Sequence, residues 1–570
     1  MPTANHDPLR RRPGLPRSPR GWAYALLAWL ASLSALASTQ VKSWAAEQIW
    51  LDYSLLSLSI PVDALERFAT QGEVDAALVP FLRRLTPERQ EELKTALTKT
   101  RSAKAFPLSQ FLYSPMGARS INFVGEFMQT DARLNGGLAL RSALIMAAAD
   151  DGEVSALEVM QKFPSQTIQL DLGKILTLVR QAEAEVDETE ALINAVAAQS
   201  AADAASPPAF DLAALPNLFQ PGPYPTRRID FTLVDASRNN RTYPVILFIP
   251  ENLAAVSGSL PIVVISHGLG ASQNNFLDAG IIASYGFAVA IPEHIGSDDV
   301  QKQALFEGLS NQLFKVSEFI DRPLDITFLL DQLERQNATQ YQGKLNLNQV
   351  AVVGHSFGGY TALALAGATI DFDRLAQTCT PAENILLDAA ELLECRALEL
   401  LDEPQVIQRL GVDGVRDPRV RLVLTYAPVS NFLGPSGIRR IQIPTVISAG
   451  GFDIVAPAVP EQVDAFSWLT TQEKYFYLFE NTSHTAGLTR MLDTMFHVDR
   501  HYDQSIQEEQ VLNRDLTKAL IVAFAKVYLE GDSAYQPFLR SAYVEAVSQS
   551  PFKRYLVREL PEPWRSELFD

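Results

Sequence analysis

Positive charge, cysteine and histidine are all scarce in this chain. Its 570 residues carry 48 Lys and Arg against 66 Asp and Glu, which gives a formal net charge of -18. An acidic surface argues against binding of nucleic acid and against a purely electrostatic grip on anionic lipid. The sequence contains two cysteines and seven histidines, and it shows no cluster of Cys, His and carboxylate residues at ligand spacing. It therefore implies no metal ion and no cofactor.

The N-terminus has the pattern of an export signal. Five arginines lie within residues 10–20, and the stretch Gly21–Ala37 is uncharged and rich in Ala and Leu. A basic segment followed by an apolar one is typical of a signal peptide, and Ser43-Trp44-Ala45 offers a small-residue cleavage site. We therefore predict a signal peptide over residues 1–45 and export to the periplasm or the exterior. An uncleaved membrane anchor at residues 21–37 is the alternative.

The chain after this leader divides into two unlike parts. Hydrophobic residues make up 47% of the sequence, which is ample for packed cores. Residues 46–196 show helix signals, such as Thr86-Pro87-Glu88 at a helix start, and predict a separate all-α domain. Residues 197–226 are rich in Ala, Ser and Pro, and predict a linker or an extended arm lying on the next domain.

Residues 227–570 alternate between strand and helix patterns, which predicts an α/β domain with a mostly parallel sheet covered by helices on both faces. An acidic, helical insertion at residues 371–417 and the loop Glu293–Phe306 are expected to shape a substrate pocket, the insertion as a cap. Both cysteines, Cys379 and Cys395, fall in this insertion. In an exported protein they can form a disulfide, which we expect, although two separate buried thiols are the alternative.

The most informative motif is the pentapeptide Gly354-His355-Ser356-Phe357-Gly358, which follows the apolar run Val350–Val353 and precedes the helix-forming stretch Tyr360–Ala368. The pattern G-x-S-x-G between a strand and a helix is a nucleophile elbow, a sharp turn that presents a serine hydroxyl. Its glycines leave room for the strained serine backbone. We therefore predict that Ser356 is a nucleophile. A glycine-rich turn without chemistry is the alternative.

A second strand pattern, Leu260–Ser266, runs into the loop His267-Gly268-Leu269-Gly270. When a serine attacks an acyl carbonyl, a negative oxygen forms, and preorganised backbone N–H groups must stabilise it. In folds built around this elbow, one N–H belongs to the residue after the nucleophile and another to such an earlier loop. The sequence thus predicts an oxyanion hole made by the N–H groups of Leu269 and Phe357. His267 is expected to stabilise the loop rather than to transfer a proton.

A nucleophilic serine also needs a histidine to take its proton. Three histidines follow Ser356, namely His484, His497 and His501. His484 lies in a turn-rich loop after the strand-like Tyr475–Phe479, which is where a mobile base is expected. The other two lie in a polar helical pattern, so His484 is the predicted base.

The carboxylate that orients this histidine is predicted to be Asp453, which follows the buried strand pattern Ile443–Ala449 and a glycine turn. That position is the carboxyl end of a strand, on the same edge of the sheet as the serine. An aspartate that only caps the following helix is the alternative. Asp413 and Asp417 are the reserve candidates, but they precede a strand pattern, Val420–Tyr426, instead of following one.

These motifs resemble those of the α/β hydrolases that are like dienelactone hydrolase and platelet-activating-factor acetylhydrolase. The whole chain resembles exported cyanobacterial members that add an N-terminal helical domain of unknown function. The resemblance implies a triad of Ser356, Asp453 and His484, and an oxyanion hole at Leu269 and Phe357. Dienelactone hydrolases proper use a cysteine nucleophile, which this chain lacks, so their substrate is not carried over.

The sequence as a whole predicts a serine esterase that hydrolyses a small-molecule or lipid ester through an acyl-enzyme. Contact with a membrane surface or the cell envelope is compatible with export. A peptidase or amidase with the same triad is one alternative, because the triad also cleaves amides. A non-catalytic envelope binding protein on a hydrolase scaffold is the other, because fold alone does not fix function. The acyl length and the oligomeric state are not determined by the sequence.

Overall fold

The computed structural model describes residues 45–54, 56–206, 211–379, 388–485, 505–550 and 552–564. The predicted leader, apart from Ala45, and the alternative anchor at residues 21–37 lie outside the described residues, as do His497 and His501. In the part of the chain that is described, no helix combines the length and the apolar character needed to span a membrane.

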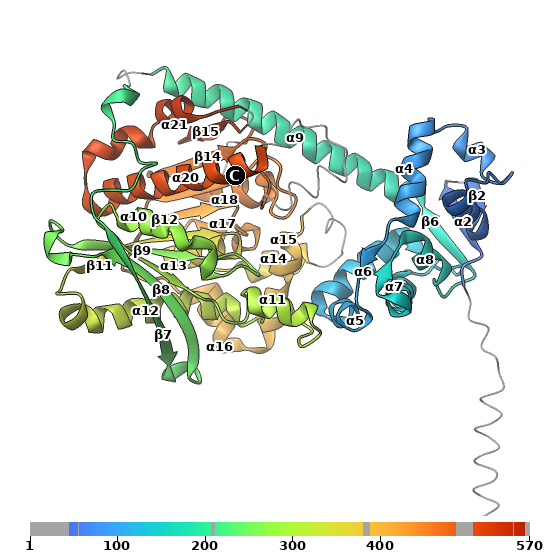
Figure 1. Cartoon of the computed structure of the whole chain (residues 1–570), viewed down its shortest axis with the longest axis horizontal. Coiled ribbons are helices and arrows are strands. Elements are labelled where there is room, and N and C mark those ends of the chain that lie inside the picture. The colour runs from blue at the N-terminus through green and yellow to red at the C-terminus, as the bar shows by residue number, and fades with distance from the viewer. Residues whose placement is uncertain are drawn as a thin grey trace, which may run out of the picture.

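A nine-stranded sheet forms the centre of the C-terminal part (Figure 1), with the strand order β15-β14-β13-β12-β11-β9-β10-β8-β7. Its strands are β7 (Thr226–Asp235), β8 (Arg241–Pro250), β9 (Leu260–Ser266), β10 (Ala288–Pro292), β11 (Leu345–His355), β12 (Val420–Tyr426), β13 (Thr445–Gly450), β14 (Lys474–Phe479) and β15 (Arg554–Val557). The strands from β14 to β10 in this order are parallel, whereas β8, β7 and β15 are antiparallel to their neighbours. The predicted α/β architecture is therefore confirmed.

Helices bury both faces of this sheet, which explains why its strands are continuous apolar runs. In β9, Ile262 and Val264 belong to the core on one face, while Val263 and Ile265 belong to the core on the other. The first core is completed by α12 (Glu318–Gln340), α13 (Phe357–Ala366) and α18 (Asp464–Trp468). The second is completed by α10 (Gly280–Ala283), α20 (Ser505–Ala525) and α21 (Ser541–Val547).

The N-terminal part differs from the all-α domain that the sequence predicted, because it contains a four-stranded sheet with the order β2-β1-β6-β4. Its strands are β1 (Gln48–Tyr53), β2 (Leu56–Pro61), β4 (Met128–Gln129) and β6 (Thr167–Asp171), and β3 (Arg101–Ser102) pairs separately with β5 (Glu153–Val154). Its helices are α2 (Val62–Gln71), α3 (Val79–Leu82), α4 (Pro87–Thr98), α5 (Ala105–Tyr113), α6 (Pro115–Phe127), α7 (Gly137–Asp151) and α8 (Ala156–Gln161). The helical prediction rested on these helices. The strands are short, and they are stabilised by partners that are distant in the sequence. For example, β1 pairs with β6, which lies more than a hundred residues further along the chain.

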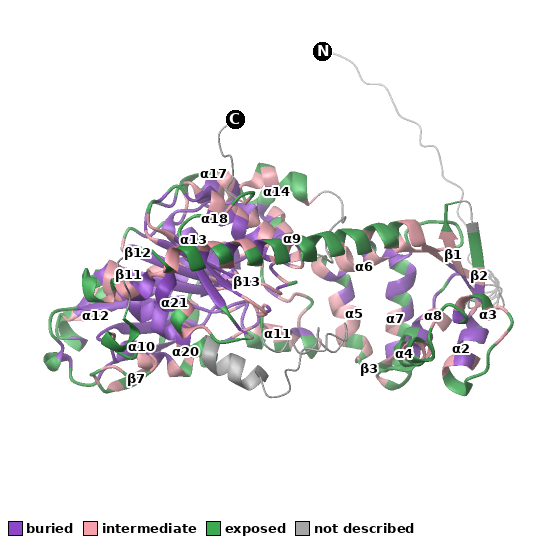
Figure 2. Ribbon diagram, turned by 90° about the horizontal axis from the view of Figure 1, so that it is seen from above, coloured by how far each residue is buried: buried purple, intermediate pink, exposed green. Residues whose placement is uncertain are grey.

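One long helix, α9 (Leu172–Ala204), connects the two parts and continues past residue 196, where the helical domain was expected to end. Figure 2 shows that much of its length is exposed. Its C-terminal half, however, belongs to the core of the C-terminal part, where Leu192 and Val196 are fully buried. Ser200 Oγ also donates a hydrogen bond of 2.9 Å to Glu545 Oε1 of α21. The helix therefore anchors the N-terminal part to the C-terminal one.

The segment after α9 is an arm that lies on the C-terminal part, one of the two forms expected for residues 197–226. Leu218 is buried in the core. Gly222 N donates to Ser284 Oγ at 2.6 Å, and Tyr285 Oη donates to Gln220 O at 2.8 Å.

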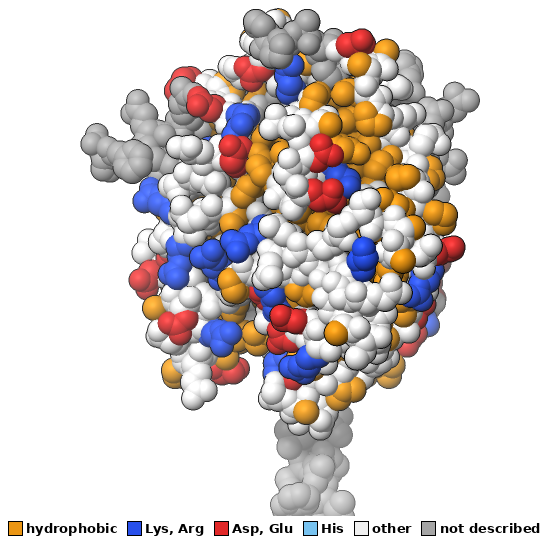
Figure 3. All heavy atoms as spheres, turned by 90° about the vertical axis from the view of Figure 1, so that its left-hand side faces the viewer, with side chains coloured by type: hydrophobic (Ala, Val, Ile, Leu, Met, Phe, Trp, Pro, Cys, Tyr) orange, Lys and Arg blue, Asp and Glu red, His pale blue; other side chains and the backbone are white. Residues whose placement is uncertain are grey.

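Figure 3 shows the surface of the C-terminal part from the end remote from the N-terminal part. Apolar side chains gather in the upper half of this surface.

The insertion between α13 and β12 is helical, as predicted. It contains α14 (Phe372–Thr378), α15 (Ala390–Glu394) and α16 (Pro404–Ile407). It lies on the side of the sheet that faces the N-terminal part, and α15 contacts α6 (Figure 1).

Candidate active site

Ser356 lies at the turn between β11 and α13 with φ 55° and ψ −120°. A positive φ at a residue with a side chain is strained, and it persists only where the surroundings impose it. The two glycines explain how the turn closes. A Cβ on Gly354 would be 2.0 Å from Gly358 O, and one on Gly358 would be 2.1 Å from Ser266 O. A side chain at Gly354 would therefore collide within the turn, and one at Gly358 would collide with the end of β9.

Asp453 and His484 are brought together, although 31 residues separate them. Asp453 follows β13 and His484 follows β14, and these parallel strands are neighbours that end at the same edge of the sheet. His484 Nδ1 lies 2.7 Å from Asp453 Oδ2. The carboxylate thus holds the ring through Nδ1, and Nε2, which makes no hydrogen bond within the described residues, can serve a substrate or a serine.

The other oxygen of Asp453 accepts hydrogen bonds from Val455 N at 2.8 Å and Ala456 N at 2.9 Å. Asp453 therefore also caps the following turn, which was the alternative reading of this residue. The backbone bonds fix the orientation of the carboxylate toward His484. The two roles are compatible because each uses a different oxygen.

Within the described residues, Ser356 Oγ makes no hydrogen bond, so its contact with His484 Nε2 remains a prediction. Contacts of this kind are often long in ligand-free enzymes and shorten when substrate binds. The two residues are nevertheless linked through His355. Its ring centroid lies 4.9 Å from that of His484, and its Nε2 donates to His484 O at 3.2 Å.

The loop that was predicted to supply an oxyanion donor passes directly beside the serine. A Cβ on Gly268 would lie 3.3 Å from Ser356 Cβ and 2.9 Å from His355 Nδ1. Neither Leu269 N nor Phe357 N donates a hydrogen bond within the described part of the chain. Both N–H groups are therefore available to a ligand at this place.

His267 is fully buried and holds the same loop, as expected. Its Nδ1 lies 2.9 Å from Gly268 O, and its Nε2 accepts from His294 N at 3.1 Å. Glu293 Oε1 is 2.9 Å from the same Nε2. All these contacts are structural, so the ring has no free nitrogen with which to act on a substrate.

Two residues near the serine were missed from the sequence. Burial lowers the pKa of His355 to about 4, so it is a neutral hydrogen-bond donor at neutral pH rather than a charged group. Arg322 is fully buried and donates to His267 O at 2.7 Å. For His355, the central position of the G-x-S-x-G motif was a usable signal. For Arg322, an arginine in the second turn of α12, there was none.

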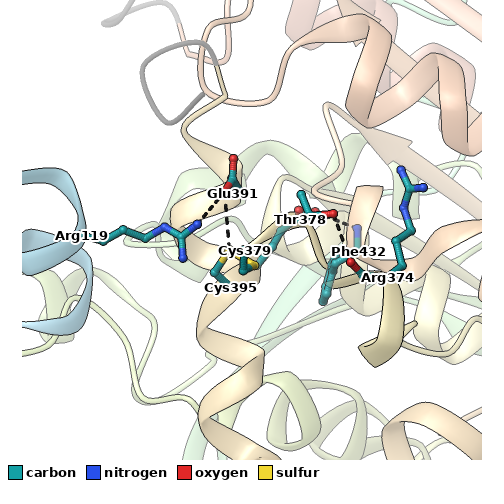
Figure 4. The surroundings of a disulfide bond; sticks show 8 residues. Arg119, Arg374, Thr378, Cys379, Glu391, Cys395 and Phe432 are labelled. Atoms are coloured by element: carbon teal, nitrogen blue, oxygen red, sulfur yellow. Dashed lines mark hydrogen bonds and ion pairs between the residues drawn. A yellow bond between two sulfur atoms is a disulfide. The ribbon is translucent and has the colours of Figure 1, made fainter. Parts of the chain in front are cut away.

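The two cysteines of the insertion are joined by a disulfide (Figure 4). Beside it, Glu391 forms an ion pair of 2.7 Å with Arg119 of α6. The reserve acids lie elsewhere. Asp417 pairs with Arg419 at 2.7 Å, and Asp413 accepts from Gln408. Neither makes a contact with His484.

Two groups of side chains among the described residues come close enough to share a metal ion. The first consists of Glu391 and the two cysteines, whose sulfurs are already joined to each other. The second is Glu293, Asp298 and Asp299. Glu293 accepts from a loop N–H and Asp298 caps α11 (Asp299–Phe306), so both serve the local fold. The absence of a metal requirement stays a prediction.

Comparison with known proteins supports the fold. Residues 45–171 match the family model described as alpha/beta hydrolase of unknown function (DUF1400), and residues 214–377 match the chlorophyllase family model. The second match contains the loop of Leu269 and the elbow of Ser356, but ends before Asp453.

Curated relatives include chlorophyllase-1, chloroplastic, from Citrus sinensis and the protein of the same name from Citrus unshiu. Each is 30% identical over 189 residues, which is 32% of this chain and 52% of the relative. The chain thus spans about half the length of the curated relatives it matches. The comparisons do not test the resemblance to platelet-activating-factor acetylhydrolase, which stays a prediction. Together, the sheet and these matches show that the chain carries an α/β-hydrolase fold.

Proposed function

We propose that this protein is a serine hydrolase that cleaves carboxylic esters. The observation that carries the proposal is the 2.7 Å contact of His484 Nδ1 with Asp453 Oδ2, at the same sheet edge as the strained turn of Ser356. A serine, a buried carboxylate and a histidine in this order along the chain form the triad of the fold. The similarity to chlorophyllases supports an ester as the substrate.

In the proposed mechanism, His484 Nε2 removes the proton from Ser356 Oγ as that oxygen attacks the ester carbonyl. The negative oxygen of the tetrahedral intermediate accepts from Leu269 N and Phe357 N. When the intermediate collapses, the C–O bond of the ester breaks, and the imidazolium gives its proton to the leaving alcohol. Water, deprotonated by the same imidazole, then attacks the acyl-serine and releases the acid.

Hydrolysis of p-nitrophenyl esters with two to sixteen carbons tests the proposal, beside the Ser356→Ala variant. We expect turnover that peaks at one chain length and falls by orders of magnitude in the variant, whose fold should survive. Covalent labelling of the wild type by a fluorophosphonate, absent in the variant, would identify the nucleophile. No turnover and no labelling of the wild type would favour a binding protein instead.

The panel should also contain chlorophyll, because the curated relatives are named for it, and amides matched to the best ester. Faster cleavage of the matched amides than of the esters would identify a peptidase or amidase. The proposed substrate class is a small-molecule or lipid ester.

We also propose export to the periplasm or the exterior. The disulfide supports this, because such bonds persist in oxidising compartments. The N-terminal sequence and the location of the protein recovered from its host distinguish a cleaved signal peptide from a membrane anchor. A start at residue 46 indicates cleavage, and an intact N-terminus in the membrane fraction indicates an anchor. A cytosolic location would contradict export.

A further inference from the structure

We propose that Arg322 is a positioning residue that aligns the two oxyanion donors of the proposed esterase. The inference rests on the proposed function. It assigns a role to a guanidinium that is completely buried in α12, beneath the loop of Leu269 and the elbow of Ser356.

The first half of the argument concerns the loop of Leu269. Arg322 Nη1 donates to His267 O at 2.7 Å. This bond fixes the peptide group between His267 and Gly268, which precedes the peptide group that carries Leu269 N–H. On the other side of the donor, Gly270 N donates to Ser297 O at 2.8 Å. Ser297 is itself held by Arg322, whose Nε donates to Ser297 Oγ at 2.9 Å. One side chain thus fixes the loop on both sides of Leu269, whose own N–H stays unused.

The second half concerns Phe357, the other donor. The guanidinium carbon of Arg322 lies 4.3 Å from the centroid of the Phe357 ring. Phe319, on the same helix as Arg322, packs against that ring edge to face at 5.2 Å. A guanidinium over a ring face is attracted by the ring quadrupole and holds the ring in place. Phe357 is the first residue of α13 and directly follows Ser356. Holding its side chain therefore also fixes its own backbone N–H, the second oxyanion donor.

A purely structural role would not require this residue. Burying a guanidinium is costly, and well-packed apolar residues often replace buried ionic groups without loss of stability. The nearest counter-charge, Glu318 Oε2, lies 3.7 Å from Arg322 Nε and also accepts from Ser297 Oγ at 2.6 Å. What an apolar side chain could not supply is the simultaneous hold on the His267 carbonyl, on Ser297 and on the Phe357 ring.

The test uses full-length mature protein with Arg322 replaced by Met, Lys or Ala. Because a misplacement of about 1 Å in an active site costs roughly 100-fold, we expect Arg322→Met to lower kcat about 100-fold with little change in KM. The kcat values are taken per active site, counted by fluorophosphonate titration. Affinity for an alkyl boronic acid, which presents a tetrahedral oxyanion to the site, should fall in parallel with kcat/KM.

Chemical rescue provides the sharper readout. Guanidinium ion at millimolar concentration should restore a substantial part of kcat to Arg322→Ala, where it fits the vacated space, but not to Arg322→Met, where the side chain fills that space. Arg419→Met is the matched control. Arg419 also anchors α12, through an ion pair of 2.8 Å with Asp331, but it has no contact with either donor. We expect its kcat per site to match the wild type.

A normal kcat per site in Arg322→Met and Arg322→Lys, with a lowered Tm alone, would overturn the inference and leave Arg322 as a structural residue. Equal loss of kcat in Arg419→Met would overturn it as well. Failure of the wild type to turn over esters or to react with the fluorophosphonate is a different result, because it rejects the proposed function itself.

Discussion

At the scale of single residues, the candidate site depends on side chains that each satisfy more than one demand. Asp453 caps a turn with one oxygen and orients His484 with the other. His355 occupies the elbow motif and also donates to the His484 carbonyl. Such double use means that the local fold and the chemistry fix each other, so that few substitutions are tolerated here.

Asp453→Asn is the informative substitution at this scale. An amide in place of the carboxylate disturbs the tautomer of His484, and in a serine triad this costs roughly 10⁴-fold in kcat. We therefore expect ester hydrolysis to fall by about that factor while the Tm changes little. Steady-state kinetics measures the effect. Asp413→Asn, in an exposed residue, is the control, and a comparable loss there would show that the acid was assigned to the wrong residue.

At the scale of elements, the insertion is tied to the sheet edge by buried acids. Glu394 of α15 accepts from Phe432 N at 3.1 Å, in the loop after β12. Glu461, in the helical turn Ala458–Val463, accepts from Asn431 N of the same loop at 3.0 Å. Burial raises the pKa of Glu394 to about 8, with the negative charge of Asp388 adding to the effect, and burial also raises the pKa of Glu461 well above its ordinary value. These carboxyl groups therefore favour the protonated form.

This arrangement predicts that stability falls as the pH rises. In the folded state Glu394 keeps its proton up to a pH of about 8, whereas in the unfolded chain it loses it near 4.5. The folded state thus binds more protons between these values, so the contribution to stability is complete below 4.5, falls progressively above it and is gone once the pH has risen through 8. We expect a lower Tm at pH 9 than at pH 6, and a smaller difference in Glu394→Gln, which does not ionise. Asp402 is an exposed acid of the same insertion, so the control Asp402→Asn should leave the difference in Tm between pH 6 and pH 9 unchanged. An unaltered pH dependence of the Tm in Glu394→Gln would contradict the argument.

At the scale of the whole molecule, the N-terminal part contacts three segments that border the candidate site. Ile193 of α9 packs on the turn before Asp453, where a Cβ on Gly451 would lie 2.9 Å from Ile193 Cδ1. Arg119 pairs with Glu391 of the insertion. Phe106 of α5 lies against Gly308, just after α11. The N-terminal part is thus placed to influence the loops that surround the triad.

The Arg119–Glu391 ion pair is the contact best suited to a test, because its side chains are only 22% and 10% exposed. Residues in contact typically show coupling energies of about 0.5–3 kcal/mol. We expect a double-mutant cycle of Arg119→Ala and Glu391→Ala, measured by denaturant unfolding, to give coupling in this range. We also expect both variants to lose more kcat/KM on sixteen-carbon esters than on acetates.

The exposed pair of Arg89 with Glu92 in α4, at 3.3 Å and with side chains 70% and 41% exposed, serves as the control for that cycle. Its alanine variants should show weak coupling and unchanged ester preference, because exposed ion pairs contribute little. Additive effects at Arg119 and Glu391, or an unaltered ester preference, would show that the N-terminal part is only tethered to the hydrolase.

The sequence by itself determined what depends on short stretches of chain. Gly354 is required by its contact with Gly358 inside the same pentapeptide, so the elbow could be predicted from its motif, whereas the contact of Gly358 with Ser266 appears only in the folded sheet. The buried strands could be predicted because helices on both faces demand unbroken apolar runs. The chain order of Asp453 and His484 after the serine made both identifiable, and the structure places them in contact.

Only the tertiary structure decided what depends on distant partners. The sheet of the N-terminal part forms because β1 meets β6, and α9 extends past its expected end because the hydrolase core covers its last turns. Arg322 meets a carbonyl 55 residues away, and Arg119 meets an acid 272 residues away. Periodicity and motifs describe the neighbours of a residue along the chain, whereas these partners are set by packing that arises once the whole chain has folded.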